Sequence, residues 1–331
     1  MNSDPYAPSY HDTQAPHALA DLIQQMRQQI RGVILGQEMV IEQVLAALLA
    51  GGHILLEGKP GLGKTHLVTT LAKTFGGVSA RIQFTPDLMP SDVTGFRLFD
   101  MKSQTFQLRK GPVFTNLLLA DEINRAPAKT QSALLEVMQE QQVTIDGETL
   151  KLTPPFMTLA TQNPIEHEGT YPLPEAQLDR FLFKLEVTRN DVATLQRIVS
   201  HRELGTDPTV EAVMDAGTFG SLLELVRRIY LPEVVANYIA RLVDASHPGQ
   251  SKGSRMIRYG ASPRAALALA SGAKARALIK GRLNASFEDV KIIASAVLRH
   301  RIVLDYSARV EGHSTNDVVR ALLEEVPFQT T

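Results

Sequence analysis

The sequence predicts an α/β fold in which a parallel five-stranded sheet lies between helices, followed by a small all-helical domain. Two observations favour this architecture. Short apolar runs suited to buried strands alternate with helical stretches in the first part of the chain, and the strand signals fade beyond about Thr188. The 331 residues suffice for two domains with their own cores. We expect the α/β domain over 17–187 and the helical domain over 188–331.

The N-terminal residues 1–16 contain three prolines and few aliphatic side chains, so they predict a disordered tail. Apolar residues at helical spacing then predict helices over Leu19–Ile30 and Glu38–Ala50. Further helices, over Thr65–Phe75 and Lys129–Gln141, separate the predicted strands. Those strands are Ile54–Glu57, Ala80–Phe84, Leu117–Asp121, Phe156–Thr161 and Phe181–Val187.

Two segments of the first domain predict small hairpins instead. In Gly95–Lys110, apolar residues fall near alternate positions on both sides of a polar turn, and Thr144–Leu152 turns at Asp146-Gly147. In the second domain, Ser262-Pro263 and Ser286 supply helix-starting residues. The helices expected there are Asp191–Glu203, Phe219–Tyr230, Pro232–Ala245, Pro263–Ile279, Phe287–Leu304 and Thr315–Glu325.

The composition bounds the function. Basic and acidic residues nearly cancel, 34 against 35, so the overall charge gives no support for nucleic-acid binding, although a local patch stays open. The absence of cysteine excludes disulfides and thiolate metal sites. No apolar run approaches the length that spans a bilayer, and no signal peptide is visible. We therefore expect a cytoplasmic protein without direct membrane contact.

Residues Gly58–Thr65, with the sequence GKPGLGKT, form a complete phosphate-binding loop between a predicted strand and a predicted helix. The glycines let backbone N–H groups turn toward phosphate oxygens, and the helix presents the positive end of its dipole to the anion. Lys64 supplies a charge for the β- and γ-phosphates, and Thr65 offers a hydroxyl to Mg²⁺. The expected binding set is Gly58, Pro60, Gly61, Leu62, Gly63, Lys64, Thr65 and His66.

The strand Leu117–Glu122 ends in two carboxylates and predicts hydrolysis of the bound nucleotide. Asp121 is the type of residue that holds Mg²⁺, usually through water, and Glu122 can polarise a water aimed at the γ-phosphate. Acidic residues also begin ordinary turns, but a preceding phosphate loop favours the catalytic interpretation. Histidines show no paired ligand spacing, so Mg²⁺ is the only metal expected.

Three further polar residues are candidates for the same chemistry, together with Lys64 and Glu122. Asn163 ends the next strand and could hydrogen-bond the attacking water, or it could simply form a turn with the following proline. Arg180 precedes the last strand and could stabilise transition-state charge, or be an ordinary surface charge. Arg264 begins a helix of the second domain and could reach the nucleotide, or be solvated on that helix.

With these residues assembled, the chain resembles the MoxR family of AAA+ ATPases over roughly residues 20–305. The generic parts of the resemblance are Walker A at Gly58–Thr65, Walker B at Leu117–Glu122, sensor 1 at Asn163, the arginine finger at Arg180 and sensor 2 at Arg264. The specific parts are three longer strings, namely Ile82–Gly95, Ala120–Glu136 and Glu168–Phe181.

The resemblance implies a strand order of 5-1-4-3-2, a helical lid and a hairpin inserted in helix 2, which Gly95–Lys110 would supply. It also implies hexameric rings, ATP and Mg²⁺ as ligands, and chaperone-like remodelling beside partners with von Willebrand factor A domains. Gly36-Gln37 matches the family's segment near adenine, so Ile34 and Gln37 would line the base. The string Asp244–His247 stands where many members have alanine-threonine-arginine, which puts any role of that arginine in doubt.

The sequence leaves three alternative hypotheses for the function. The first is Mg²⁺-dependent ATP hydrolysis that drives remodelling or maturation of protein complexes by a ring. The second is the motor of a metal-chelatase-like or nucleic-acid-remodelling complex, against which the near-neutral charge counts. The third is a nucleotide switch without hydrolysis, against which Glu122 argues. GTP specificity is not expected, because no Asn-Lys-x-Asp string occurs.

Overall fold

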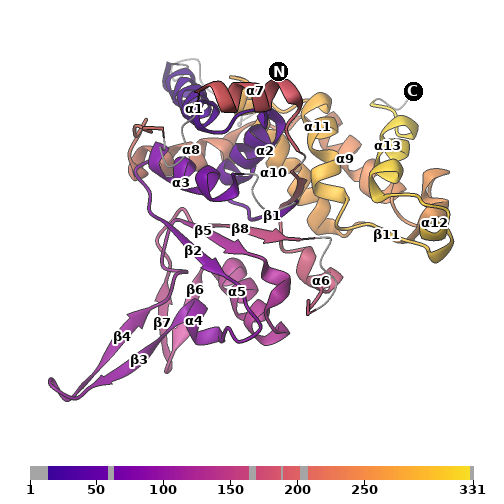
Figure 1. Cartoon of the computed structure of the whole chain (residues 1–331). Coiled ribbons are helices and arrows are strands. Elements are labelled where there is room, and N and C mark those ends of the chain that lie inside the picture. The colour runs from indigo at the N-terminus through magenta and orange to yellow at the C-terminus, as the bar shows by residue number, and fades with distance from the viewer. Residues whose placement is uncertain (1–13, 59–62, 164–168, 188, 202–207, 329–331) are drawn as a thin grey trace, which may run out of the picture.

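The computed structural model describes residues 14–58, 63–163, 169–187, 189–201 and 208–328 (Figure 1). Its first helix, α1 (Gln14–Val33), begins two residues before the predicted end of the N-terminal tail at Pro16. The rest of that predicted tail lies outside the described residues. None of the helices in the described ranges has both the length and the apolar character that a bilayer crossing requires.

Five parallel strands form the central sheet in the spatial order β2-β5-β8-β1-β9. Numbered along the chain and read from the other edge, this order is 5-1-4-3-2, so the predicted topology is confirmed. The three inner strands are buried at every residue except the last, because helices cover both faces of the sheet. The strands are β1 (Ile54–Glu57), β2 (Ser79–Gln83), β5 (Leu117–Asp121), β8 (Met157–Gln162) and β9 (Phe183–Glu186).

Alternate residues of each inner strand enter two separate cores. Ile54 and Leu56 of β1 pack into a core that the N-terminal and C-terminal helices share, whereas Leu55 faces a smaller core on the opposite side. The helices α2 (Glu38–Leu49) and α3 (Lys64–Thr74) cover the first face together with α1. The helix α5 (Ala128–Glu140) covers the second.

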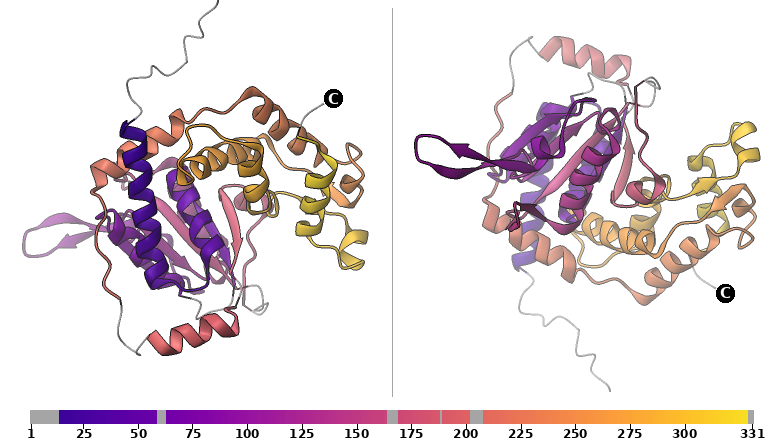
Figure 2. Two further views of the ribbon diagram at one scale, coloured as in Figure 1. Left: turned by 90° about the horizontal axis from the view of Figure 1, so that it is seen from above. Right: turned by 90° about the horizontal axis from the view of Figure 1, so that it is seen from below.

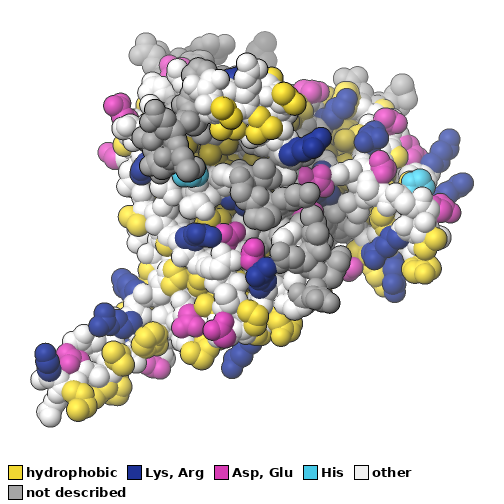
Figure 3. Space-filling model, viewed as in Figure 1, with side chains coloured by type: hydrophobic (Ala, Val, Ile, Leu, Met, Phe, Trp, Pro, Cys, Tyr) yellow, Lys and Arg dark blue, Asp and Glu magenta, His cyan; other side chains and the backbone are white. Residues whose placement is uncertain are grey.

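Both predicted hairpins are present. The first consists of β3 (Gly95–Asp100) and β4 (Thr105–Lys110), follows the short helix α4 (Pro90–Thr94), and extends away from the body of the molecule (Figures 1 and 2). Exposed apolar side chains gather on it (Figure 3). They are Phe96, Leu98, Phe99, Met101 and Phe106.

The second hairpin consists of β6 (Gln142–Ile145) and β7 (Glu148–Lys151). It turns at Asp146-Gly147, whose φ angles of 49° and 83° both lie in the left-handed region. An aspartate-glycine pair tolerates this backbone, which is why the dipeptide predicted the turn.

The C-terminal part is mainly helical (Figure 2). Its longer helices are α7 (Val192–His201), α8 (Ala216–Arg228), α9 (Glu233–Ala245), α10 (Pro263–Ile279), α11 (Phe287–Leu298) and α13 (Thr315–Glu325), with the short α12 (Tyr306–Val310) between the last two. The prediction of one helix through Leu304 was wrong. The helix ends at Leu298, and β11 (Val303–Leu304) instead pairs antiparallel with β10 (Ile257–Tyr259), a tertiary contact that overrides the local helical pattern.

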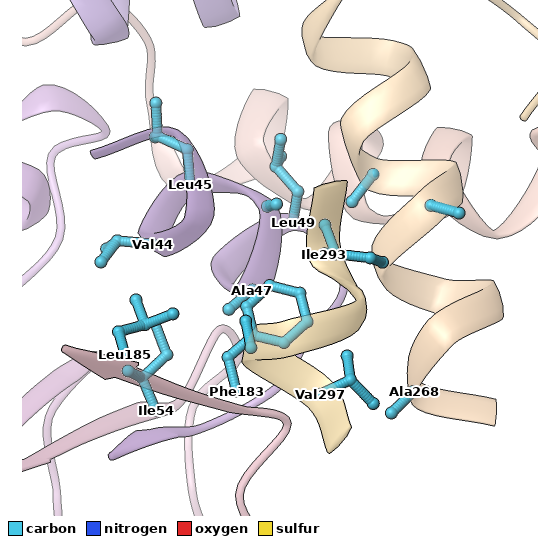
Figure 4. Close-up of a cluster of buried hydrophobic side chains, with 14 of the residues drawn as sticks. Val44, Leu45, Ala47, Leu49, Ile54, Phe183, Leu185, Ala268, Ile293 and Val297 are labelled. Atoms are coloured by element: carbon cyan, nitrogen blue, oxygen red, sulfur yellow. The ribbon is translucent and has the colours of Figure 1, made fainter. Parts of the chain in front are cut away.

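The helical part packs directly on the sheet edge formed by β9. Phe183 of β9 lies among Ala47 of α2, Ile293 of α11 and neighbouring apolar side chains (Figure 4). A Cβ atom on Gly272 of α10 would lie 2.7 Å from Ile293 Cδ1 and 2.8 Å from Phe183 Cζ, so α10 approaches this cluster as closely as a glycine permits. The edge of the sheet and the C-terminal helices therefore share one core.

Candidate nucleotide site

The phosphate loop connects β1 to α3, as its motif requires. Gly63 lies before the helix with φ +76°, a left-handed conformation that glycine adopts without strain. A Cβ atom on Gly58 would lie 2.9 Å from the Val187 carbonyl oxygen, so the end of β9 also requires glycine there. Lys64 Nζ donates a hydrogen bond to the Gly58 carbonyl at 3.1 Å. The predicted ligands Pro60, Gly61 and Leu62 lie outside the described residues.

A cavity of about 390 Å³ opens beside this loop at the carboxyl ends of the strands. It brings together Lys64, the adjacent pair Asp121 and Glu122, and Asn163, which come from three separate segments of the chain. The described lining residues are Gly58, Gly63, Lys64, Thr65, His66, Arg81, Gln83, Asp121, Glu122, Thr161 and Asn163. Ligands bind at this edge of open α/β sheets because strand ends and helix N-termini converge there.

Both carboxylate oxygens of Asp121 are engaged. Oδ1 accepts a 2.6 Å hydrogen bond from the hydroxyl of Thr161 on the neighbouring strand β8, and Oδ2 accepts a 2.8 Å bond from Arg81 Nη2 on β2. Carboxylate and hydroxyl oxygens are the donors that Mg²⁺ prefers, so Asp121 and Thr65 fit this metal. A bound Mg²⁺ would therefore share the Asp121 carboxylate with Arg81.

Glu122 has a left-handed backbone, with φ 56° and ψ 50°. This conformation costs a non-glycine residue about 1–2 kcal/mol. Its backbone N–H donates to Thr161 Oγ1 at 2.8 Å, and its carboxylate accepts a 2.9 Å hydrogen bond from Gln83 Nε2. Arg125 lies 2.9 Å from the same carboxylate oxygen. The carboxylate thus has a fixed position at the mouth of the cavity.

Burial lowers the pKa of Lys64, and the nearby carboxylates of Asp121 and Glu122 partly offset that shift. The lysine therefore gains stabilisation from any additional anion brought into the cavity. A triphosphate is such an anion, and the adjacent N-terminus of α3 adds favourable dipole charge.

The predicted base-binding residues Ile34 and Gln37 line a second, largely apolar slot beside the loop, together with Leu56 and Val187. Gln37 is buried, and its Nε2 donates a 3.0 Å hydrogen bond to Asn190 Oδ1 just before α7. The slot encloses only about 10 Å³, the space of one water molecule. A purine ring requires this slot to widen.

Arg180 and Arg264 lie elsewhere. Because β1 and β9 run parallel with Ile54 opposite Phe183, Arg180 lies at the amino-terminal edge of the sheet, whereas the phosphate loop leaves the carboxyl edge. Both arginines line a different cavity of about 330 Å³, which also contains Gly51 and His53 at the start of β1. The structure therefore separates the predicted site residues into two groups at opposite edges of one sheet.

Three residues of the nucleotide cavity, namely Arg81, Gln83 and Thr161, were not among the site residues predicted from the sequence. Arg81 and Gln83 alternate on β2, so they share one face. Thr161 belongs to a recognised strand end and has a side chain fully shielded from solvent. These three residues could have been identified as polar residues at or near the carboxyl ends of predicted parallel strands.

The fold and this cavity define a nucleotide-binding P-loop protein with an AAA+ arrangement of sheet and lid. Comparison with known proteins supports the same class. Residues 53–183 match the family "ATPase family associated with various cellular activities (AAA)", and residues 251–322 match the AAA lid domain.

Individual relatives narrow the class further. The chain is 43% identical to "Chaperone MoxR1" of Mycobacterium tuberculosis over 90% of this chain and 80% of that protein. It is also 43% identical to the uncharacterised protein YeaC of Bacillus subtilis, over 91% and 93%. "Protein MoxR" of Methylorubrum extorquens is 29% identical over 93% and 95%.

A crystal structure of a candidate ATPase from Cytophaga hutchinsonii superposes with a TM-score of 0.89 at 42% identity, covering 96% of this chain and 98% of that one. The chain belongs to the MoxR family of AAA+ ATPases, and it is a chaperone-like ATPase.

Proposed function

We propose that this protein binds Mg²⁺ and ATP, hydrolyses the ATP as a hexameric ring, and uses the energy to remodel or mature protein complexes. The main observation in favour of the ring is that Arg180 and Arg264 lie at the opposite edge of the sheet from the phosphate loop of their own subunit. Two arginines at the amino-terminal edge of the sheet cannot serve the nucleotide at the carboxyl edge of the same subunit. In a head-to-tail ring, they meet the nucleotide of the next subunit.

Each residue of the nucleotide cavity has a role in this proposal. Lys64 and the backbone of the loop bind the β- and γ-phosphates, while Thr65 and Asp121 hold the metal. Bound Mg²⁺ neutralises charge on the phosphates. Glu122 orients a water and accepts its proton, and Asn163 hydrogen-bonds that water or the γ-phosphate.

Arg180 and Arg264 complete the cavity from the neighbouring copy. Their guanidinium groups stabilise the negative charge that builds up on the γ-phosphate in the transition state. Because Arg264 lines the same cavity as Arg180, we assign both arginines to the neighbour's nucleotide.

Mixing two inactive variants tests the ring. Arg180→Ala keeps its own cavity, and Glu122→Gln keeps its arginines. If the arginines act on the neighbour, an equal mixture restores turnover at about a quarter of its interfaces, because each active interface pairs one copy of each variant. Arg227→Ala, at an exposed arginine of α8, is the control and retains full turnover. A mixture that assembles but stays inactive contradicts the proposal.

The family resemblance adds a proposed partner with a von Willebrand factor A domain. The Glu122→Gln variant holds ATP without cleaving it, so it should retain such a partner in an ATP-dependent pull-down. Binding that is equal with and without ATP argues against coupling to the cycle. A cytoplasmic location belongs to the same proposal, because the site needs ATP.

A further inference from the structure

We propose that Arg301 and Asp179 are positioning residues that fix Arg180 and Arg264 of one subunit to its lid, so that both arginines reach the neighbouring nucleotide as one unit. This inference rests on the proposed ring. Beyond the ring itself, it identifies the residues that position the two arginines.

Arg301 follows α11 and has a side chain only 3% exposed. Its guanidinium makes five hydrogen bonds, which matches the number of N–H donors that arginine carries. Nε donates to Asp179 Oδ1 at 2.7 Å, and Nη2 donates to the carbonyls of Asp179 and Phe181 at 3.2 and 2.7 Å. Nη1 donates to the carbonyls of Leu182 and Val297 at 3.1 and 2.6 Å.

These acceptors surround Arg180 in the chain. The carbonyls belong to Asp179, just before Arg180, and to Phe181 and Leu182, the two residues after it, so one buried guanidinium fixes the backbone path through Arg180. His300 adds a 3.0 Å hydrogen bond from Nε2 to the Phe181 carbonyl. The end of α11 therefore holds the whole turn that presents Arg180.

Asp179 connects this turn to the start of α10 as well. Its second oxygen, Oδ2, accepts a 3.2 Å hydrogen bond from the hydroxyl of Ser262, which precedes α10, and lies 3.9 Å from Arg264 Nη1. One carboxylate thus connects the turn before β9, the end of α11 and the start of α10.

The arginines themselves are held loosely. The Arg264 side chain is 56% exposed, and its ion pair with Asp179 is long. Within the described ranges, the Arg180 side chain makes no hydrogen bond or ion pair, while the residues on both sides of it are anchored. Anchored backbones with loosely held guanidinium groups suit residues whose partner is a phosphate on another subunit.

Substitution of Arg301 tests the proposal. Lysine keeps the charge but offers no planar fork, so Arg301→Lys cannot make the five bonds together. We expect its turnover number to fall about 10–100-fold through misplacement of the neighbouring arginines, with the ATP affinity of its own cavity unchanged. Arg320→Lys, at an exposed arginine of α13, is the matched control and keeps full turnover.

Mixed assemblies separate positioning from a merely structural role. Glu122→Gln subunits supply well-placed arginines to the intact cavities of Arg301→Lys subunits, so the mixture should recover turnover to the same extent as Arg180→Ala mixed with Glu122→Gln. If only the Arg180→Ala mixture recovers, Arg301 acts on its own cavity or fold and the inference is overturned. If neither mixture recovers, the ring proposal itself fails.

A second variant keeps the test decisive if Arg301→Lys does not fold. Asp179→Asn leaves the backbone carbonyls available to Arg301 but removes the charge that joins α10 and α11 to the turn. It should lose turnover, retain ATP binding and recover on mixing with Glu122→Gln. An Asp179→Asn protein with undiminished turnover on its own contradicts the inference.

Discussion

The hydroxyl of Thr161 connects the two acidic residues of the candidate site. It donates to Asp121 Oδ1 at 2.6 Å and accepts a hydrogen bond from the Glu122 N–H at 2.8 Å. Thr161 is fully buried at the end of β8, next to β5 in the sheet. A single hydroxyl therefore orients the carboxylate of Asp121, the proposed metal ligand, and fixes the backbone position of Glu122, the proposed base.

We predict that Thr161→Val weakens Mg²⁺-dependent ATP turnover about 10–100-fold, the usual effect of removing a group that orients a metal ligand. Valine preserves the shape but leaves Asp121 Oδ1 and the Glu122 N–H without this partner. Turnover titrated with Mg²⁺ measures the effect, and nucleotide binding in EDTA should be unchanged. Thr161→Ser keeps the hydroxyl and should stay near wild type. Equal Mg²⁺ dependence in the valine and serine variants would contradict the role.

Much of the candidate site could be predicted because its motifs are contiguous in sequence. The phosphate loop and the carboxylates after β5 were identified from their neighbours along the chain, and the structure brings them to one cavity. Arg81 could not be identified in this way, because its relevance depends on β2 lying beside β5. The opposite-edge position of Arg264 likewise follows from how the lid packs on β9, which no local pattern contains.

The fold was predictable to a similar extent. Short apolar runs that alternate with helical stretches identified the sheet, and the turn at Asp146-Gly147 identified a hairpin. The pair β10 and β11 has three and two residues, too short for any periodic signal. The chain after Leu298 has a helical composition, but Arg301 there bonds to carbonyls of the turn around Arg180, an interaction over more than a hundred residues of sequence.

Glu42 joins the N-terminal helices to the lid. Its buried carboxylate in α2 lies 3.2 Å from Arg27 of α1, 3.2 Å from Arg276 of α10 and 2.8 Å from Lys280. We predict that Glu42→Gln lowers the free energy of unfolding by about 3–5 kcal/mol, because it removes the buried anion that Arg27, Lys280 and Arg276 share, of which, among the described residues, only Arg276 keeps another anion, Asp289.

Urea denaturation at neutral pH measures this loss. The matched control is Glu224→Gln, which breaks an exposed ion pair with Arg227 on α8 and should change the free energy of unfolding by less than about 0.5 kcal/mol. Similar values for the two variants would show that the buried network does not stabilise the junction of α1, α2 and α10.

His53 makes the stability depend on pH. Burial lowers the pKa of His53 from 6.5 to about 4. Its Nε2 donates to the Met138 carbonyl at 2.9 Å, and its Nδ1 accepts from the Thr158 N–H at 3.0 Å, so the neutral ring satisfies both partners. Between pH 6.5 and about pH 4, His53 of the unfolded chain binds a proton that His53 of the folded chain does not. The free energy of unfolding therefore falls as the pH falls through this range.

We predict that this residue contributes a loss of about 2 kcal/mol in the free energy of unfolding between pH 7 and pH 4.5. His53→Gln removes the titrating group, so its denaturation midpoints should fall less steeply over that range. Burial also lowers the pKa of His300, but that residue is present in both proteins, and its contribution cancels in the difference. Denaturation midpoints that fall equally with pH in the wild type and in His53→Gln would show that protonation of His53 does not destabilise the fold.

Two helical glycines offer a test with opposite signs. A Cβ atom at Gly272 of α10 would lie 2.7 Å from Ile293 Cδ1 and 2.8 Å from Phe183 Cζ, whereas a Cβ atom at Gly220 of α8 would meet nothing within 4 Å. We predict that Gly272→Ala destabilises the protein by about 1–3 kcal/mol through overpacking between the lid and β9. Gly220→Ala should stabilise it by about 0.5–1 kcal/mol, because alanine loses less backbone entropy in a helix. Thermal denaturation of the two variants measures both effects, and a stabilised Gly272→Ala protein would show that α10 does not approach the sheet as closely as described.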